Sequence, residues 1–233
     1  MSRLSLNAVI AAAGIGKRVG ATIPKQYLPL SGKTIIEHSI EPFLNHPDIQ
    51  KVIVSIAEND LWFAQLPVAK NYKVKVVIGG KERVDSVLCA LKVLPSEGYV
   101  LVHDAARPCI TSTDIDKLIN AAVQSKHGAI LGTRVRDTMK RSDPAGHITH
   151  TVCRQNLWHA LTPQMFENKV LINAIESAEF PQQITDEASA MEMAGLTVAI
   201  IEGRSDNLKV TREEDLILAE LYLSSSTSIS TSK

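Results

Sequence analysis

The chain has 233 residues, with 25 basic and 25 acidic side chains and a hydrophobic fraction of 45%. A chain of this length can bury a large core without disulfides or a metal, and its zero net charge provides no global field to recruit nucleic acid or an anionic membrane. Three widely spaced cysteines, no secretory signal and no apolar run of membrane-spanning length favour a reduced, cytoplasmic protein with neither nucleic acid nor membrane as a partner.

The first predicted element is an apolar strand over residues 6–13 that leads into a glycine turn. Gly14 and Gly16 let the backbone approach an anion closely, and the cations Arg18 and Lys25 follow. Backbone N–H groups that converge with side-chain charges are typical of a polyphosphate site. We therefore expect a nucleotide at this turn.

Two better-known phosphate loops do not fit this region. The dinucleotide fingerprint G-x-G-x-x-G fails because Val19 stands at the third glycine position. Gly32-Lys33-Thr34 resembles the end of a Walker P-loop, but Tyr27 stands where its first glycine belongs, so we expect a turn that leads into a helix. Spacing alone also allows a plain strand and turn with surface cations, and other segments have to decide.

The rest of the chain alternates short apolar strands with amphipathic helices. Strands are expected at residues 51–57, 73–79, 99–103, 128–133 and 197–202, and helices at 34–44, 83–94, 111–126, 167–178, 186–194 and 211–223. This alternation is typical of an α/β fold with a mostly parallel sheet flanked by helices on both faces. We expect a single domain over residues 1–223 and a disordered Ser/Thr-rich tail over 224–233.

Residues 134–154 interrupt the alternation with two polar, strand-like halves around Asp143-Pro144-Ala145-Gly146. The segment predicts a β-hairpin with too few apolar residues to belong to a core, so it would project from the body as an arm. A hairpin of this kind is only marginally stable alone. It either packs on a second copy of the chain or remains a mobile surface excursion.

Polar residues follow several predicted strands, where ligands bind in open α/β sheets. Asp104 and Arg107 come at the end of the fourth strand, and Asp104 suits a hydroxyl or a hydrated Mg²⁺ as well as a helix cap or turn. Gly80 and Ser86 belong to a turn that opens a helix and suits a base or a phosphate. Lys209 precedes the final helix, where a solvated surface charge is the simpler interpretation.

Other chemistries find no matching pattern. His103 has no second histidine at ligand spacing, so we interpret it as a structural histidine. The chain also shows no Ser/His/Asp triad, no zinc-ligand spacing and no aromatic platform typical of RNA binding.

Taken together, the motifs resemble those of the 2-C-methyl-D-erythritol 4-phosphate cytidylyltransferases of the non-mevalonate isoprenoid pathway over nearly the whole chain. They lie at residues 12–18, 24–27, 102–108, 137–138, 162–164, 185–189 and 207–211. The first two are shared by many nucleotidyltransferases, whereas the later ones are more specific. The resemblance implies a Rossmann-like nucleotidyltransferase fold with a projecting β-arm, and a homodimer in which each arm helps to form the partner's site.

The resemblance further implies a transferase that moves CMP from CTP to a polyol phosphate, with Mg²⁺ bound mainly through the CTP phosphates and no assigned protein ligand for the metal. Catalytic roles would fall to Arg18, Lys25 and Lys209. CTP binding would fall to Ala12, Ala13, Gly14, Gly16, Gly80 and Ser86. Polyol-phosphate binding would fall to Asp104, Arg107, Thr138, Arg154, Thr162 and Lys209.

Two alternatives stay open. Ribitol 5-phosphate cytidylyltransferases are similar in the first loop and could use the same arm, although residues 104–108 resemble the methylerythritol enzyme more closely. A non-catalytic regulator on the same fold would bind CTP without releasing pyrophosphate.

Overall fold

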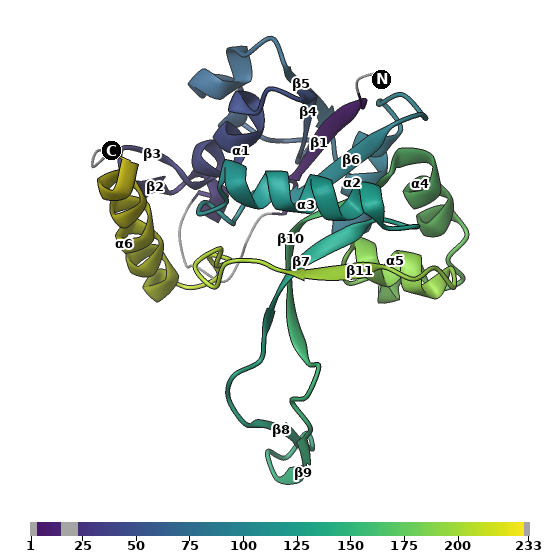
Figure 1. The fold of residues 1–233 in the computed structure, drawn as a ribbon. Helices are drawn as coiled ribbons and strands as arrows, with labels where there is room; N and C mark the ends of the chain where they lie inside the picture. The colour runs from purple at the N-terminus through teal and green to yellow at the C-terminus, as the bar shows by residue number, and fades with distance from the viewer. Residues whose placement is uncertain (1–3, 15–22, 231–233) are drawn as a thin grey trace.

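The computed structural model describes residues 4–14 and 23–230 and contains a seven-stranded sheet of order β11-β7-β10-β6-β1-β4-β5 (Figure 1). Its strands are β1 (Leu6–Ala11), β4 (Ile49–Ile56), β5 (Val74–Ile78), β6 (Tyr99–Asp104), β7 (Ala129–Arg134), β10 (Trp158–Glu167) and β11 (Ala199–Glu202). The strand pairs are parallel except those of β10, which runs antiparallel to β6 and β7. The mostly parallel sheet expected from the sequence is confirmed.

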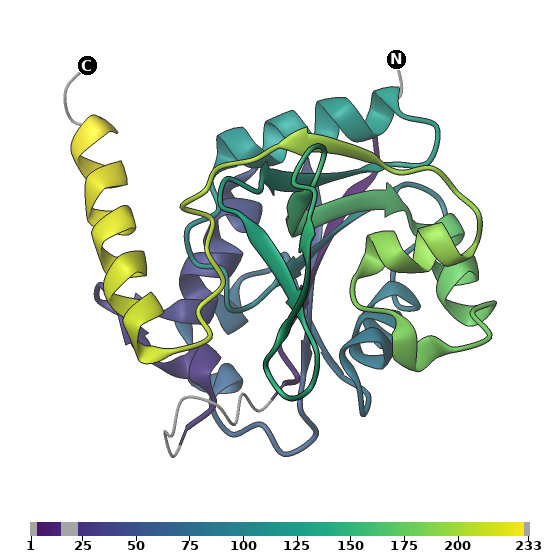
Figure 2. The ribbon, with the colours of Figure 1, turned by 90° about the horizontal axis from the view of Figure 1, so that it is seen from below.

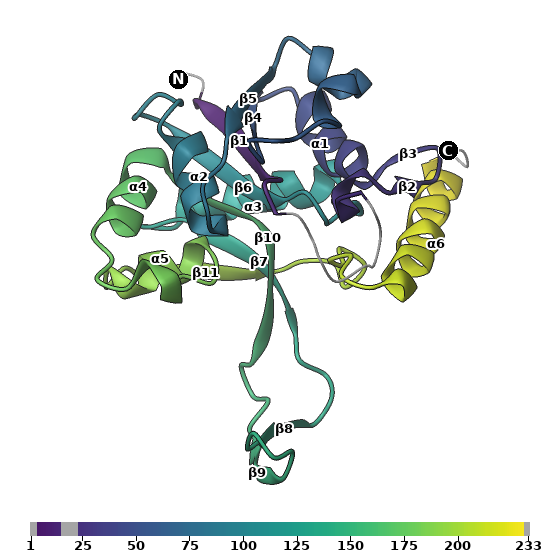
Figure 3. The same ribbon diagram turned by 180° about the vertical axis from the view of Figure 1, so that it is seen from behind.

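Helices cover both faces of this sheet, as Figures 1 and 3 show from opposite sides. One face carries α1 (Ile35–Asn45) and α3 (Ser112–Gln124), and the other carries α2 (Arg83–Leu91), α4 (Asn168–Glu176) and α5 (Glu187–Met193). In β1, Ala8 and Ile10 pack in the hydrophobic core on the face covered by α1 and α3, whereas Val9 packs in the core on the opposite face. Because successive side chains point to opposite faces and both faces are covered, a central strand is expected to be largely apolar, and β1 is apolar except at the buried Asn7.

The segment Gly32-Lys33-Thr34 is a turn that precedes α1, as expected. It forms the turn and the second strand of a small hairpin of β2 (Pro29–Leu30) and β3 (Lys33–Thr34), where Gly32 has a φ of +82°. The Glu37 N–H donates to the Thr34 hydroxyl, and the Glu37 carboxylate accepts from the Thr34 N–H. This reciprocal capping box starts the helix. Among residues 4–14 and 23–230, short 3₁₀ turns also lie at Lys25–Tyr27, Phe63–Gln65, Pro67–Lys70 and Pro181–Gln183.

Strand β10 was not expected from the sequence. Its residues 162–164 include Pro163, and proline removes a ladder hydrogen bond, so this segment gives no strand signal. The sheet accommodates Pro163 at an irregularity, since the register of β10 against β7 shifts between Ala160 and Gln164. Met165 and Phe166, both fully buried, then pair with β6 and anchor the strand in the core.

The expected arm is present and projects from the body (Figures 1 and 2). It consists of β8 (Met139–Ser142) and β9 (Ile148–Val152), which pair in antiparallel fashion around the predicted turn. At its base, where β7 pairs with β10, the Arg134 guanidinium lies 4.4 Å from the centre of the Trp158 ring. The side chains of β8 are all exposed, in agreement with the polar sequence.

Helix α6 (Glu213–Ser230) lies beside the β2–β3 hairpin at one side of the body (Figure 2). The helix continues through residues 224–230, where the sequence analysis predicted a disordered tail. No glycine or proline interrupts residues 211–230, and the Ser224 and Ser225 hydroxyls donate to the Leu221 carbonyl in a pattern that helices tolerate. The structure therefore corrects that expectation for residues 224–230, and residues 231–233 lie outside the described part of the chain.

Candidate active site

A cavity of about 540 Å³ opens at the carboxyl ends of β1 and β6. The chain passes from β1 to β4 on one side and returns to β6 on the other, which makes this the switch point where open α/β sheets bind ligands. The sequence-predicted residues that line it are Ala12, Ala13, Gly14, Lys25, Gly80, Ser86, Asp104 and Lys209. Segments far apart in the sequence are thus brought to one place, as expected from their positions after strands.

The backbone after β1 is held by the side chain of Gln26. Its Nε2 donates to the carbonyl oxygens of Ala12 at 2.8 Å and Gly14 at 3.1 Å, and the residue is buried. These bonds fix the course of the turn as far as Gly14. No spacing rule indicates this contact, so sequence reasoning assigned Gln26 no role. The predicted site residues Gly16 and Arg18 lie outside the described residues.

The turn after β5 packs directly against the turn after β1. A Cβ atom added at Gly79 would lie 2.6 Å from the Ala13 Cβ and 2.7 Å from the Ser86 Oγ, so only glycine fits there. The Gly80 N–H donates to the Ser86 hydroxyl at 3.1 Å, and that hydroxyl donates to the Glu82 carbonyl at 3.0 Å. The Ser86 hydroxyl therefore stabilises the conformation of the turn by bonding to its backbone at Gly80 and Glu82.

Asp104 is the centre of a charge cluster at the end of β6. Its Oδ1 lies 3.0 Å from the Arg83 Nε, and its Oδ2 lies 2.8 Å from the Lys209 Nζ and 3.7 Å from the Arg107 Nε. Burial alone would raise the pKa of Asp104, but the three cations outweigh it and hold that pKa well below its usual range. The carboxylate is therefore ionised throughout the neutral pH range.

Arg83 joins this cluster to a second buried carboxylate. Its Nη1 and Nη2 donate to the two oxygens of Glu187 at 2.7 and 3.2 Å. Burial alone would lower the pKa of Arg83. The negative charges of Glu187 and Asp104 raise it by a larger amount, so the net shift is upward. Sequence reasoning missed both residues of this pair, which lie 104 positions apart in the chain.

Behind Asp104, His103 and Thr162 form a buried network. The Asp104 N–H donates to the Thr162 hydroxyl at 3.1 Å, which lies 2.9 Å from the His103 Nδ1. The His103 Nε2 lies 3.1 Å from the Arg107 carbonyl oxygen, so this ring nitrogen carries the proton and Nδ1 accepts from Thr162. Burial lowers the pKa of His103 to about 4, which keeps the ring neutral. The expectation of a structural histidine is confirmed.

Arg107 and Thr162 are tied to the loop that precedes Lys209. The Arg107 Nη1 donates to the Asn207 carbonyl oxygen, and the Asn207 Nδ2 donates to the Thr162 carbonyl oxygen, each at 2.8 Å. Both residues are buried against Asp104 and are not part of the cavity lining. They brace the cluster in this chain.

The two predicted catalytic lysines that the structure describes meet at the segment before α6. The Lys25 Nζ donates to the Val210 carbonyl oxygen at 2.9 Å, and the Val210 N–H donates to the Ala106 carbonyl oxygen at 2.8 Å. This arrangement places Lys25 beside Lys209 at the cavity. Lys209 therefore lines the cavity and forms an ion pair with Asp104. The interpretation of Lys209 as a solvated surface charge is wrong.

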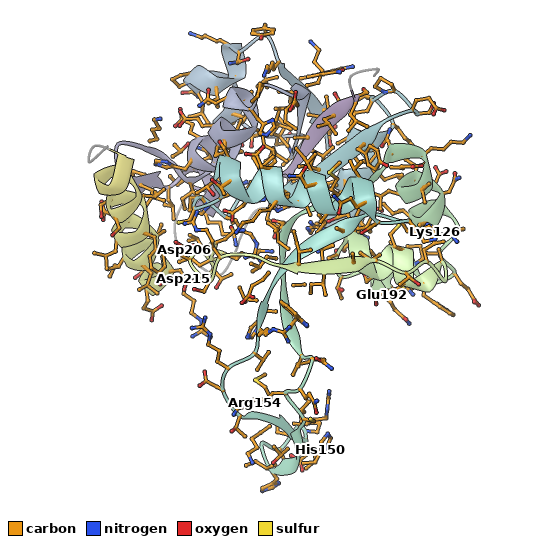
Figure 4. The ribbon with its side chains drawn as sticks, viewed as in Figure 1. Lys126, His150, Arg154, Glu192, Asp206 and Asp215 are labelled. Carbon is orange, nitrogen blue, oxygen red and sulfur yellow. The ribbon has the colours of Figure 1, made fainter. Side chains whose placement is uncertain are left out.

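The structure does not bring Thr138 and Arg154 to the cavity of their own chain. Thr138 precedes β8, and the Arg154 guanidinium donates to the Arg136 carbonyl oxygen within the arm. Figure 4 shows Arg154 on the arm, apart from Asp206 and Asp215 on the body. A site that contains both these residues and Asp104 would need two chains.

Within residues 4–14 and 23–230, no group of three or more His, Cys, Asp or Glu side chains lies close enough together to hold a metal ion. Among the helices of that same part of the chain, none combines the length and the apolarity needed to cross a membrane.

Comparison with known proteins identifies the family. The family model IspD, described as 2-C-methyl-D-erythritol 4-phosphate cytidylyltransferase, matches residues 6–225. Proteins of that name from Aeromonas hydrophila and Shewanella pealeana are 58% and 55% identical to this chain, covering 95% and 93% of it and 90% and 94% of their own lengths. A crystal structure of the Francisella tularensis protein of that name superposes with a TM-score of 0.81 at 34% identity, covering 94% of this chain and 99% of that one.

These matches extend over the glycine turn, the Asp104 cluster and the arm alike. They confirm the resemblance drawn from the motifs and do not favour the ribitol alternative. The chain belongs to the 2-C-methyl-D-erythritol 4-phosphate cytidylyltransferase family.

Proposed function

We infer that this chain transfers CMP from CTP to 2-C-methyl-D-erythritol 4-phosphate, giving 4-diphosphocytidyl-2-C-methyl-D-erythritol and pyrophosphate. Family membership supports both substrates. The observation that carries the inference is the cavity, where the backbone of residues 12–14 and Gly80 meets Lys25, Lys209 and Asp104. Glycine backbone suits a nucleotide, and the charged side chains suit a second, anionic substrate.

The reaction needs charge stabilisation more than proton transfer. The acceptor phosphate is already an anion, so an oxygen of that group can attack the α-phosphorus of CTP in line while the bond to the β-phosphate breaks and pyrophosphate leaves. The protein must bring two anions together and stabilise the charge of the transition state. We assign this task to Lys25 and Lys209, which line the cavity, and to Arg18 from the family motif.

The nucleotide half of the site comprises Ala12, Ala13, Gly14 and Gly80, with Ser86 holding the Gly80 turn. Gly16 is assigned here from the motif alone. Mg²⁺ would be bound mainly through the CTP phosphates, where it would neutralise part of their charge. The ion pairs of Asp104 are consistent with Mg²⁺ that is bound through phosphates and not through this carboxylate, because a carboxylate already paired with three cations is a poor metal ligand.

The acceptor half comprises Asp104, Arg107, Thr162 and Lys209, with Arg107 and Thr162 bracing the other two. Thr138 and Arg154 of the partner subunit would complete it, because the arm carries these residues away from the cavity of their own chain. The proposal thus includes a homodimer. It also includes a cytoplasmic location, which the free cysteines Cys89, Cys109 and Cys153 support.

The test is pyrophosphate release from CTP and Mg²⁺ in the presence of 2-C-methyl-D-erythritol 4-phosphate, ribitol 5-phosphate or no acceptor. We expect release with the first acceptor only. Turnover of ribitol 5-phosphate alone would overturn the acceptor assignment, and CTP binding without release under all three conditions would indicate a non-catalytic regulator.

A further inference from the structure

The guanidinium of Arg83 bridges two carboxylates that belong to different parts of the fold. Arg83 is the first residue of α2, directly after the turn that contains Gly80. Its Nε donates to Asp104 at the end of β6, and its Nη1 and Nη2 donate to Glu187 at the start of α5. A planar fork of this kind fixes the direction of every bond it makes, which a lysine cannot do.

Glu187 is a rigid support for this bridge. Its side chain is 3% exposed, and it lies in the first turn of α5, where the helix dipole favours a carboxylate. The start of α5 is itself tied to β10, because Gln164 donates to the Asp186 carboxylate at 2.8 Å and accepts from the Ala188 N–H at 2.9 Å. Glu187 therefore holds Arg83 from a fixed point in the core.

The bridge decides how Asp104 presents its two oxygens. Oδ1 pairs with Arg83, which leaves Oδ2 for Lys209 at 2.8 Å, with the Arg107 Nε farther away at 3.7 Å. If Glu187 did not hold the two Nη groups, the guanidinium could turn them to Asp104 and compete with Lys209, or turn them to a phosphate in the cavity, which Arg83 lines. Either movement would change the geometry of the Asp104–Lys209 pair.

The charges within this cluster make the role of Glu187 measurable. Arg83, Arg107 and Lys209 are positive, whereas Asp104 and Glu187 are negative, so the cluster carries one net positive charge. A neutral residue in place of Glu187 would add a second net positive charge. Anions in general would then bind as well or better, while an acceptor that needs Asp104 in one orientation would bind worse.

We propose that Glu187 is a positioning residue for the acceptor site, which acts by holding Arg83 so that the Asp104 carboxylate keeps one oxygen for Lys209. This inference rests on the proposed function, because it takes Asp104 and Lys209 as the residues that bind the polyol phosphate. In this proposal Arg83 supports Asp104. Because Arg83 also follows the Gly80 turn directly, it links the nucleotide half of the site to the acceptor half.

The experiment compares Glu187→Gln with Glu37→Gln. Glu37 is also a buried glutamate in the first turn of a helix, α1, and it is not part of the cavity lining. For Glu187→Gln we expect the KM for the polyol phosphate to rise about tenfold while the KM for CTP stays equal or falls. For Glu37→Gln we expect a lower melting temperature with both KM values unchanged. Equal increases of both KM values in Glu187→Gln would show a general structural defect and overturn the proposal.

Two further measurements keep the result decisive. Arg83→Lys retains the positive charge but cannot bridge both carboxylates, so it should show the same split between the two KM values even if Glu187→Gln does not fold. A crystal structure of either variant should show the Asp104–Lys209 contact displaced, and an unchanged contact would refute the positioning role. If the wild-type protein does not use the polyol phosphate, the proposed function fails, but this structural readout still judges the role of Glu187.

Discussion

The Lys209 Nζ lies 2.8 Å from the Asp104 Oδ2, and this ion pair joins the end of β6 to the segment before α6. The pair sits in the cavity wall, with Asp104 nearly buried and Lys209 partly exposed. A cation held in this way has a fixed position and a partly compensated charge. It can contact an incoming phosphate while the carboxylate contacts a hydroxyl, which matches a phosphorylated polyol.

We expect Asp104→Asn to impair the acceptor and spare the nucleotide. The amide has the shape of the carboxylate but leaves Arg83, Arg107 and Lys209 without their shared counter-ion. The ratio kcat/KM for the polyol phosphate should fall by a factor of about 10² or more, because a charged hydrogen-bond acceptor is lost from a buried cluster. Calorimetric titration should show CTP affinity within a few-fold of the wild type. A matching loss of CTP affinity would place Asp104 in the nucleotide half of the site.

We expect Lys25→Ala to act on kcat. The Lys25 Nζ donates to the Val210 carbonyl oxygen, next to Lys209 in the chain. From this position its charge can stabilise the phosphoryl group during transfer. Removal of one such charge should lower kcat by a factor of about 10² or more. Lys33→Ala is the control, because Lys33 forms a surface ion pair with Glu41 and is not in the cavity lining. A rise in KM for CTP with kcat unchanged would reduce Lys25 to a binding residue.

The sequence predicts the fold well where apolar runs are continuous. Strands such as β1 and β6 are buried on both faces, so their sequences cannot be taken for loops. Strand β10 was missed because Pro163 and its polar neighbours are typical of turns, and the sheet accepts them only through a local shift of register. The segment 224–230 was predicted to be disordered because it is rich in serine. That composition does not end a helix that has already begun, and α6 continues through it.

The site was predictable only in part, for a related reason. Asp104 and Gly80 follow strands, and the rule that ligands bind beyond strand ends applies to them directly. Arg83, Glu187 and Gln26 owe their roles to contacts made across the tertiary structure, and their local sequence is that of ordinary helix starts or turns. The roles of Thr138 and Arg154 stay predictions, because they depend on contacts between the arm of one chain and the cavity of another.

We expect the stability of the protein to fall between pH 6.5 and pH 4 through His103. The unfolded chain binds a proton at this histidine near pH 6.5, whereas burial lowers the pKa in the folded chain to about 4. The stabilisation is thus complete above pH 6.5 and is lost as the pH falls toward 4. From pH 7.5 to pH 5 this group should remove about 2 kcal/mol from the free energy of unfolding.

Urea denaturation at the two pH values measures this contribution. In His103→Gln the amide can still donate to the Arg107 carbonyl oxygen but does not titrate, so the difference between the two pH values should shrink by about 2 kcal/mol. His147→Gln, which changes an exposed histidine of the arm, should retain the wild-type difference. If His103→Gln retained it too, the pH dependence would have another origin.

We expect subunit mixing to show that the arm acts on the partner's cavity. Arg154→Ala and Asp104→Asn should each be nearly inactive with the polyol phosphate. In a mixed dimer, the body of the Arg154→Ala chain keeps Asp104 and receives an intact arm from the Asp104→Asn chain, so one site is complete. After random exchange of equal amounts, about one quarter of the wild-type activity should return, since half of the dimers are mixed and each has one complete site. Asp104→Asn mixed with a chain that carries both substitutions should recover nothing. Failure of the first mixture to regain activity, with exchange verified by native mass spectrometry, would mean that Arg154 serves its own chain or none.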